Sequence, residues 1–209
     1  LVEKNFLTSA ESKVLAEGRD RLWTIRFGLQ LVAGRAADRL LFEHQQKLAQ
    51  MFGYQDGDQL AVEQFMQDYY RTALEVNHTN RLLLRHFDEA IVETRARIEP
   101  INEWFQLRNN YLEAIRDTIF IEHPAALIEM FVIMGNRDDI QGVRAATIRL
   151  VRKHAGLIDD DFRNDPEVTG LFLDLLRSRH HLFTQLRRME RYGILGTYLP
   201  EFARIIGQM

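Results

Sequence analysis

Apolar residues in the first part of the chain follow a helical pattern. Two interleaved series recur every seven residues: Leu15, Leu22 and Leu29, and Gly18, Ile25 and Val32. This spacing places both series on one face of a long helix. Thr8 and Glu11 have the spacing of a capping box, which predicts where that helix begins. Gly34 predicts its end.

Three further amphipathic helices are predicted before Pro100, from their apolar periodicity and from the turn residues between them. The first covers about residues 40–53, and the second about residues 58–76, with Asp58 as its expected N-cap. The third covers about residues 79–96. Four amphipathic helices joined by short loops indicate a helical bundle.

The helical period breaks around Pro100, which cannot continue a helix. The segment 104–115 alternates loosely between apolar and polar residues around the pair Asn109–Asn110. Because asparagine tolerates positive φ, this pair predicts a short β-hairpin. We place a domain boundary at the break, between a helical bundle at residues 1–99 and a second helical subdomain at residues 100–209.

The second subdomain returns to helices with recognisable start and stop residues. A proline or an aspartate marks most of the starts, and a glycine marks most of the stops. The expected helices begin at Pro124, at Asp138 or Asp139, at Asp165–Pro166 and at Pro200. One further helix is expected to end at Gly193. The run Asp159–Asp161 is interpreted as a solvated loop. The predicted fold is therefore all-α, with one short β-hairpin.

The amino-acid composition excludes several classes of function. The chain has 209 residues, a formal net charge of −3 and no cysteine. The missing cysteine excludes disulfides, thiolate nucleophiles and Cys-based zinc or iron–sulfur sites, and it fits a cytoplasmic protein. Acidic and basic residues are balanced along the chain, so we expect no nucleic-acid partner. No apolar stretch is long enough for a membrane helix, so we expect no membrane partner.

No motif supplies a self-contained catalytic centre. Glycine-rich nucleotide loops and the Gly-x-Ser-x-Gly elbow are missing from the sequence. Glu75 and His78 have the spacing found in di-iron carboxylate bundles, but the second copy that such a site needs is missing. Asp56 and Asp58 imitate the paired acids of a magnesium site, although their position between two helices favours a turn and a cap. We therefore expect this chain to bind no metal.

One polar cluster lies where the first helix meets the second: Arg26, Arg35, Asp38 and Arg39. Guanidinium groups are suited to bidentate contacts with phosphate or carboxylate. The cluster therefore has two interpretations, a site near nucleotide phosphates or an internal ion-pair network that holds the helix corner. The chemistry of the residues favours the ion-pair network.

The run that contains this cluster resembles the helical segment that follows the nucleotidyltransferase core in bacterial PII uridylyltransferase/uridylyl-removing enzymes. The matching residues are Trp23, Ile25, Arg26, Gly34, Arg35, Asp38, Arg39, Leu40, Leu41, Phe42 and Gln45. Further matches are Met66, Asp68–Arg71 and Phe105–Arg108. The C-terminal segment Leu186–Met209 resembles the segment that leads into that family's HD domain. Gln30 stands where the family usually has histidine, and Ala37 stands where an acid is frequent.

The resemblance implies a parent enzyme that transfers UMP from UTP to the signalling protein PII when glutamine is scarce. The same parent removes UMP by hydrolysis when glutamine is plentiful. It implies magnesium and UTP as requirements of the parent, and flanking transferase and HD domains before Leu1 and after Met209. We therefore expect a central helical module that scaffolds both neighbours, binds no cofactor itself and is inactive in isolation.

A hypothesis from another class is a free-standing all-α module whose exposed apolar stripes bind a partner protein. The start of the chain, Leu1-Val2-Glu3-Lys4, has neither methionine nor the features of a signal peptide. This start indicates a piece of a longer chain. The flanking reading frame distinguishes the two hypotheses, because transferase and HD motifs support the first and stop codons support the second.

Overall fold

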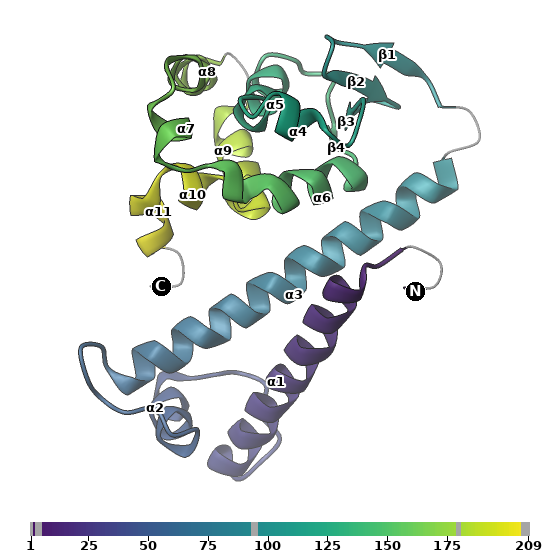
Figure 1. The fold of residues 1–209 in the computed structure, drawn as a ribbon. Coiled ribbons are helices and arrows are strands. Elements are labelled where there is room, and N and C mark those ends of the chain that lie inside the picture. Colours follow the sequence, from purple (N-terminus) through teal and green to yellow (C-terminus); the bar gives the residue numbers. More distant parts are fainter. Residues whose placement is uncertain (1, 3–5, 93–95, 179–180, 206–209) are drawn as a thin grey trace. The chain divides into compact units, whose positions relative to one another are not determined.

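The computed structural model describes residues 2, 6–92, 96–178 and 181–205 (Figure 1). The chain divides into two compact units: the first contains the described residues up to Leu84 together with Ile205, and the second is Arg85–Arg204. The division falls inside one continuous helix, α3 (Ala61–Val92). The boundary proposed from the sequence, between residues 99 and 100, lies beyond the end of this helix and stays a prediction.

Helix α1 (Ser9–Ala33) begins and ends where the sequence predicts. The Glu11 amide donates to the Thr8 hydroxyl, and the Thr8 amide donates to the Glu11 carboxylate, which completes the capping box. Gly34 ends the helix with a φ of 65°, a left-handed conformation that glycine adopts without strain.

Helix α2 (Phe42–Met51) also matches its prediction, but the next two predicted helices are wrong as separate elements. They form the single helix α3, because neither glycine nor proline interrupts the stretch between Val76 and Thr79. The expected cap at Asp58 is wrong as well, since the Ala61 amide donates to Asp56 Oδ1 over 2.7 Å. Residues 93–95, at the end of the predicted fourth helix, lie outside the described residues.

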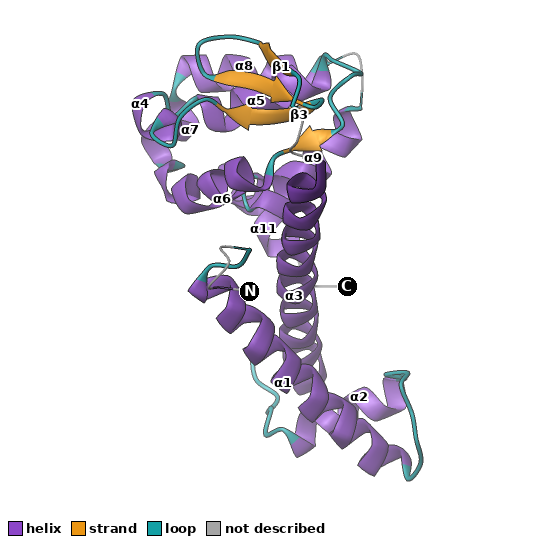
Figure 2. Cartoon of the chain, turned by 90° about the vertical axis from the view of Figure 1, so that its right-hand side faces the viewer, coloured by secondary structure: helices purple, strands orange, loops and turns teal. Residues whose placement is uncertain are grey.

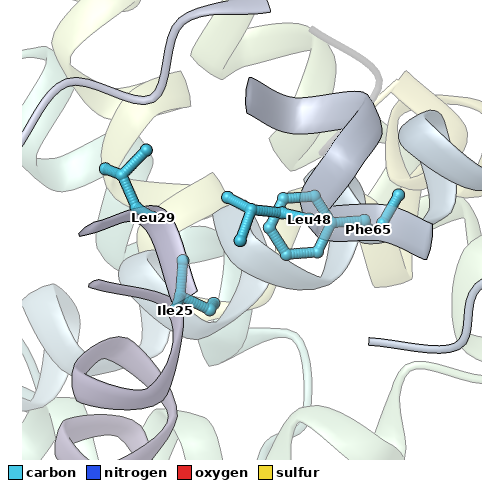
Figure 3. Packing of buried hydrophobic residues seen from close by; sticks show 5 residues of the cluster. Ile25, Leu29, Leu48 and Phe65 are labelled. Atoms are coloured by element: carbon cyan, nitrogen blue, oxygen red, sulfur yellow. The ribbon is translucent and has the colours of Figure 1, made fainter. Parts of the chain in front are cut away.

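The core of the first unit forms where α1, α2 and α3 meet. Its buried members are Ile25, Leu29, Leu48, Ala49 and Phe65. Figure 3 shows Ile25 and Leu29 on α1 beside Leu48 and Phe65 from the other two helices. Their spacing on α1 is that of the predicted apolar series, so the heptad pattern identified the face that is buried.

The second unit contains a small sheet of four described strands: β1 (Ile98–Pro100), β2 (Phe105–Arg108), β3 (Tyr111–Ala114) and β4 (Gly142–Val143). The β2–β3 hairpin confirms the prediction, and Asn109 and Asn110 have φ values of 51° and 63°. The antiparallel strand β1 and the short parallel strand β4 were not predicted. The sheet lies on one side of this unit (Figures 1 and 2).

Helices make up most of the second unit. They are α4 (Ile119–Glu122), α5 (Ala126–Gly135), α6 (Ala145–His154), α7 (Asp160–Asn164), α8 (Pro166–Leu176), α9 (Leu182–Tyr192), α10 (Leu195–Tyr198) and α11 (Pro200–Ile205), with a 3-10 turn at Ala155–Leu157. Helix α5 carries the most buried stretch of this core, because Leu127, Ile128, Met130 and Phe131 are 0% exposed. The helices expected to end at Gly135 and Gly193 and to start at Pro166 and Pro200 are confirmed.

Three local predictions in this unit are wrong. Asp138 and Asp139 cap no helix, because α6 begins after Arg144 and Asp139 instead pairs with Arg137 at 2.6 Å. Pro124 precedes α5 by two residues and lies in a turn. The run Asp159–Asp161 is not a loop, since Asp159 caps the short helix α7 by accepting from the Phe162 amide.

Within the part of the chain that the structure describes, no helix is both long enough and apolar enough to cross a membrane.

Candidate functional site

Helix α1 has two apolar faces. Ile25 and Leu29 are buried in the core of the first unit, and Val32 packs against it. Trp23, Phe27 and Leu31 follow each other at intervals of four residues, and their side chains are 64%, 64% and 56% exposed. At about 100° per residue, these three lie roughly 180° around the helix from the core face. We call Trp23, Phe27 and Leu31 the outer face of α1.

The predicted cluster is only partly assembled beside this face. Arg26 Nε donates to Asp38 Oδ1 over 2.8 Å, with the two side chains 52% and 71% exposed. The Arg26 guanidinium also lies 5.9 Å from the centroid of the Trp23 ring, a cation–π distance. Arg35 and Arg39 are exposed, and neither forms an ion pair with a described residue. An exposed ion pair of this kind contributes little to stability.

The loop between α1 and α2 is attached to the core of the first unit by apolar contacts and one hydrogen bond. Ala37 and Leu40 pack against the core cluster of the first unit, and the side-chain amide of Gln45 donates to the Leu40 carbonyl over 3.0 Å. The arginines of the loop consequently project from an anchored backbone.

The sequence analysis did not identify a second set of hydrogen-bonded polar side chains in the first unit. Arg21 Nη2 donates to the Tyr54 hydroxyl over 2.8 Å, and that hydroxyl donates to Asp68 Oδ2 over 2.7 Å. Burial raises the pKa of Tyr54, and the hydrogen bond and negative charge of Asp68 add to that rise. The chain of contacts joins α1, the α2–α3 loop and α3. The three residues are separated by 33 and 14 positions, so no local motif reveals it.

The other residues considered for metal binding do not come together. Among the described residues, no group of three or more His, Asp or Glu side chains could hold a metal ion. Glu75 is exposed on α3, and Asp56 serves as the acceptor for the Ala61 amide. The described residues therefore do not fit the magnesium that the resemblance implies for the parent enzyme.

A third polar group, in the second unit, also escaped the sequence analysis. Arg108, Glu113, Arg144 and Glu89 form a chain of ion pairs whose side chains are 8–25% exposed. One signal was readable from the sequence: in a hairpin centred on Asn109–Asn110, strand alternation places Gln106, Arg108 and Glu113 off the core. The contribution of α3 and Arg144 depends on the tertiary structure.

Comparisons with known proteins agree on one family. A model described as "GlnD PII-uridylyltransferase" matches residues 1–84, and one described as "Uridylyltransferase GlnD third domain" matches residues 105–198. No solved structure matches the chain.

The curated relatives carry one name. Proteins called bifunctional uridylyltransferase/uridylyl-removing enzyme from Azotobacter vinelandii, Pseudomonas aeruginosa and Nitrosococcus oceani are 50%, 49% and 48% identical to this chain over 212 aligned residues. The alignments cover 100% of this chain and 24% of each relative, so the chain spans about a quarter of the length of the curated relatives it matches. The chain therefore belongs to the family of bifunctional uridylyltransferase/uridylyl-removing enzymes.

Proposed function

We propose that this chain is the central helical module of an enzyme that transfers UMP from UTP to PII and removes it by hydrolysis. The module scaffolds the two activities and contains neither catalytic centre. Family membership supports the parent's chemistry, and the share of 24% of each relative leaves ample chain for two catalytic domains. Residues 1–99 would then support the transferase core, and residues 100–209 would lead into the HD domain of a cytoplasmic enzyme that responds to glutamine.

The outer face of α1 carries this proposal. Trp23 and Phe27 each expose 64% of their area, and Leu31 exposes 56%. Contiguous large apolar side chains in water are unfavourable, and such patches usually mark an interface. Burying an aromatic or leucine side chain contributes about 1.5–3 kcal/mol, so a domain covering all three gains several kcal/mol. We assign the transferase core of the longer enzyme as the domain that covers this face.

The arginines beside that face give the module a second role. Arg26 is held by Asp38, whereas Arg35 and Arg39 extend into solvent from an anchored loop. A transferase core docked on the outer face would bring its nucleotide towards these guanidinium groups, which suit phosphate contacts. Magnesium would be held by residues elsewhere in the longer enzyme, because the described residues provide no group to hold it.

The test uses the intact enzyme carrying Trp23→Ser with Phe27→Ser. We expect UMP transfer to PII to fall by tenfold or more, with UMP removal largely retained, because the lost apolar contact weakens docking by about 3 kcal/mol or more. Met51→Ser is the matched control, since Met51 is 51% exposed on α2 and lies outside the outer face. Unchanged transfer by the double variant would rule out the docking surface.

A separate variant tests the arginines. In the intact enzyme, Arg35→Ala should raise the Michaelis constant for UTP and leave the melting temperature unchanged, because Arg35 is exposed and braces no described side chain. A lower melting temperature with an unchanged Michaelis constant would instead assign a structural role. The isolated 209-residue chain should show neither transfer nor hydrolysis.

A further inference from the structure

The second unit contains a charged pocket that the proposed function does not use. Its volume is about 300 Å³. The end of α3, the β2–β3 hairpin and the segment before α6 enclose it. The lining residues are Arg85, Asp88, Glu89, Arg108, Asn109, Tyr111, Gln141 and Arg144. A pocket of this size admits a small molecule and excludes a folded partner.

Two of the lining arginines are neutralised and held in place by carboxylates. Arg108 Nε donates to both oxygens of Glu113, over 2.9 and 3.1 Å. Arg144 lies 3.5 Å from Glu89 and 3.5 Å from Glu113, with 13% of its side chain exposed. Burial raises the pKa of Glu89, and the Ala145 amide and the positive charges of Arg144 and Arg85 oppose that rise. These contacts fix the guanidinium groups without giving the pocket a negative balance.

The groups in direct contact with Arg85 are neutral, and the carboxylate of Glu89 acts on it only from a greater distance. Its Nη1 donates to the Val143 carbonyl over 2.5 Å, and its guanidinium lies 5.5 Å from the centroid of the Tyr111 ring. A Cβ at Gly142 would lie 2.6 Å from Arg85 Nη1, so the glycine is what allows this guanidinium to approach the strand. Arg85 forms no ion pair with a described carboxylate. Most of its five N–H donors are consequently available to a ligand.

The guanidinium group of Arg188, which is outside the lining, adds positive charge beside the pocket. Arg188 Nη2 donates over 3.0 Å to the carbonyl of Gln141, a lining residue, and its Nη1 donates to Gln185 Oε1 over 3.1 Å. These partners are neutral, and the described residues offer Arg188 no ion pair. Burial lowers the pKa of Arg188, and the positive charges of Arg85 and Arg191 lower it further. Such a concentration of partly buried positive charge is unfavourable without an anion.

We propose that this pocket binds a phosphate-bearing small molecule, with Arg85 as its principal ligand. Guanidinium forks match the oxygens of phosphate, and a bound phosphate group balances the positive charge of Arg85 and Arg188 that the lining carboxylate of Asp88 leaves over. The Arg108 side chain adds donors, because its contacts with described residues use only Nε. Asp88 is exposed among the lining residues and opposes the ligand's charge.

The experiment measures binding to the 209-residue chain by titration calorimetry and ³¹P NMR. The probes are inorganic phosphate, pyrophosphate, UMP and, as the phosphate-free control, uridine. We expect binding of the phosphate-bearing probes that weakens as salt is added, and no binding of uridine. UMP binding more tightly than phosphate would indicate a nucleotide as the source of the group, and the reverse order would indicate free phosphate.

Three variants place the binding in this pocket. Arg85→Gln should weaken binding by about tenfold or more, because it removes a charged hydrogen-bond donor. Asp88→Asn should tighten binding by about two- to fivefold, because it removes a repelling charge at an exposed position whose replacement does not threaten folding. Asp161→Asn makes the same charge change on α7, at an exposed residue outside the pocket lining, and should leave affinity unchanged.

Two outcomes would overturn the proposal. One is that no phosphate-bearing probe binds. The other is that Asp88→Asn and Asp161→Asn change affinity equally, which would show that only net charge matters. Circular dichroism of Arg85→Gln separates lost binding from lost folding. The Asp88→Asn result tests the pocket even if Arg85→Gln does not fold.

Discussion

Two glycines inside helices offer a matched test of how the first unit is packed. Gly18 lies in α1 where the helix meets α3, and a Cβ built on it would overlap Val76 Cγ2. Gly170 lies in α8, and a Cβ there would have no atom within 4 Å. The same substitution, glycine to alanine, should therefore change stability in opposite directions at the two positions.

The magnitudes follow from two competing effects. Alanine favours a helix over glycine by about 0.5–1 kcal/mol, and Gly170→Ala should gain that amount. At Gly18 the new methyl group falls well inside the ordinary carbon–carbon contact distance of about 3.5–4.0 Å. Valine in a helix has one strongly preferred rotamer, so Val76 cannot turn away. Overpacking costs about 1–3 kcal/mol, which leaves Gly18→Ala destabilised by about 1–2 kcal/mol after the helix gain.

Urea denaturation followed by circular dichroism measures both changes, and hydrogen exchange of peptides from α1, α3 and α8 assigns each change to its unit. The double variant Gly18→Ala with Val76→Ala should recover part of the loss, because the second substitution removes the overlapping methyl group. If Gly18→Ala stabilised the protein as Gly170→Ala does, the close approach of α1 and α3 would be refuted.

The remaining predictions concern a cap and two titrating groups. Asp56→Ala should lower the free energy of unfolding by about 1 kcal/mol, because the Ala61 amide loses its acceptor, whereas Asp58→Ala should change it little; equal effects in urea denaturation would contradict this assignment. Asp68→Asn should move the raised pKa of Tyr54 down towards its usual range, because the carboxylate that opposes ionisation is gone, and NMR of labelled tyrosine rings measures the shift. Burial raises the pKa of Glu129, so the folded state retains a proton that the unfolded state releases, and this contribution to stability is lost as pH rises. Glu129→Gln should therefore flatten the fall in unfolding free energy as pH rises above the ordinary glutamate pKa of about 4.3, and an unchanged slope would show that Glu129 does not titrate in this way.

Elements with recognisable start and stop residues could be predicted from local chemistry. The Thr8–Glu11 capping box, the glycine ends at Gly34 and Gly193, and the start at Asp165–Pro166 involve residues close in sequence. Their hydrogen bonds form within one turn of chain, so the residue types at the right spacing are sufficient. The asparagine pair at the hairpin belongs to the same class, because positive φ is a property of the residues themselves.

Predictions failed where two local signals were equally acceptable. Asp56 and Asp58 both precede α3, and only the path of the loop decides that Asp56 reaches the Ala61 amide. Asp138 and Asp139 resemble caps, but pairing of β3 with β4 occupies the chain at Gly142–Val143 and delays α6 until Ala145. Strand pairing over about 30 residues has no local signature, so sequence periodicity could not detect it.

By itself, the sequence determined that the protein is mainly helical, where several of its helices begin or end, which face of α1 is buried, and which family it resembles. The tertiary structure alone decided which charges meet. Arg26 finds Asp38 while Arg35 and Arg39 stay exposed, and Arg85 reaches a pocket shared with Arg108 and Arg144. The reason is physical: helix and turn formation depend on neighbours along the chain, whereas an ion pair or a pocket depends on distances that only packing sets.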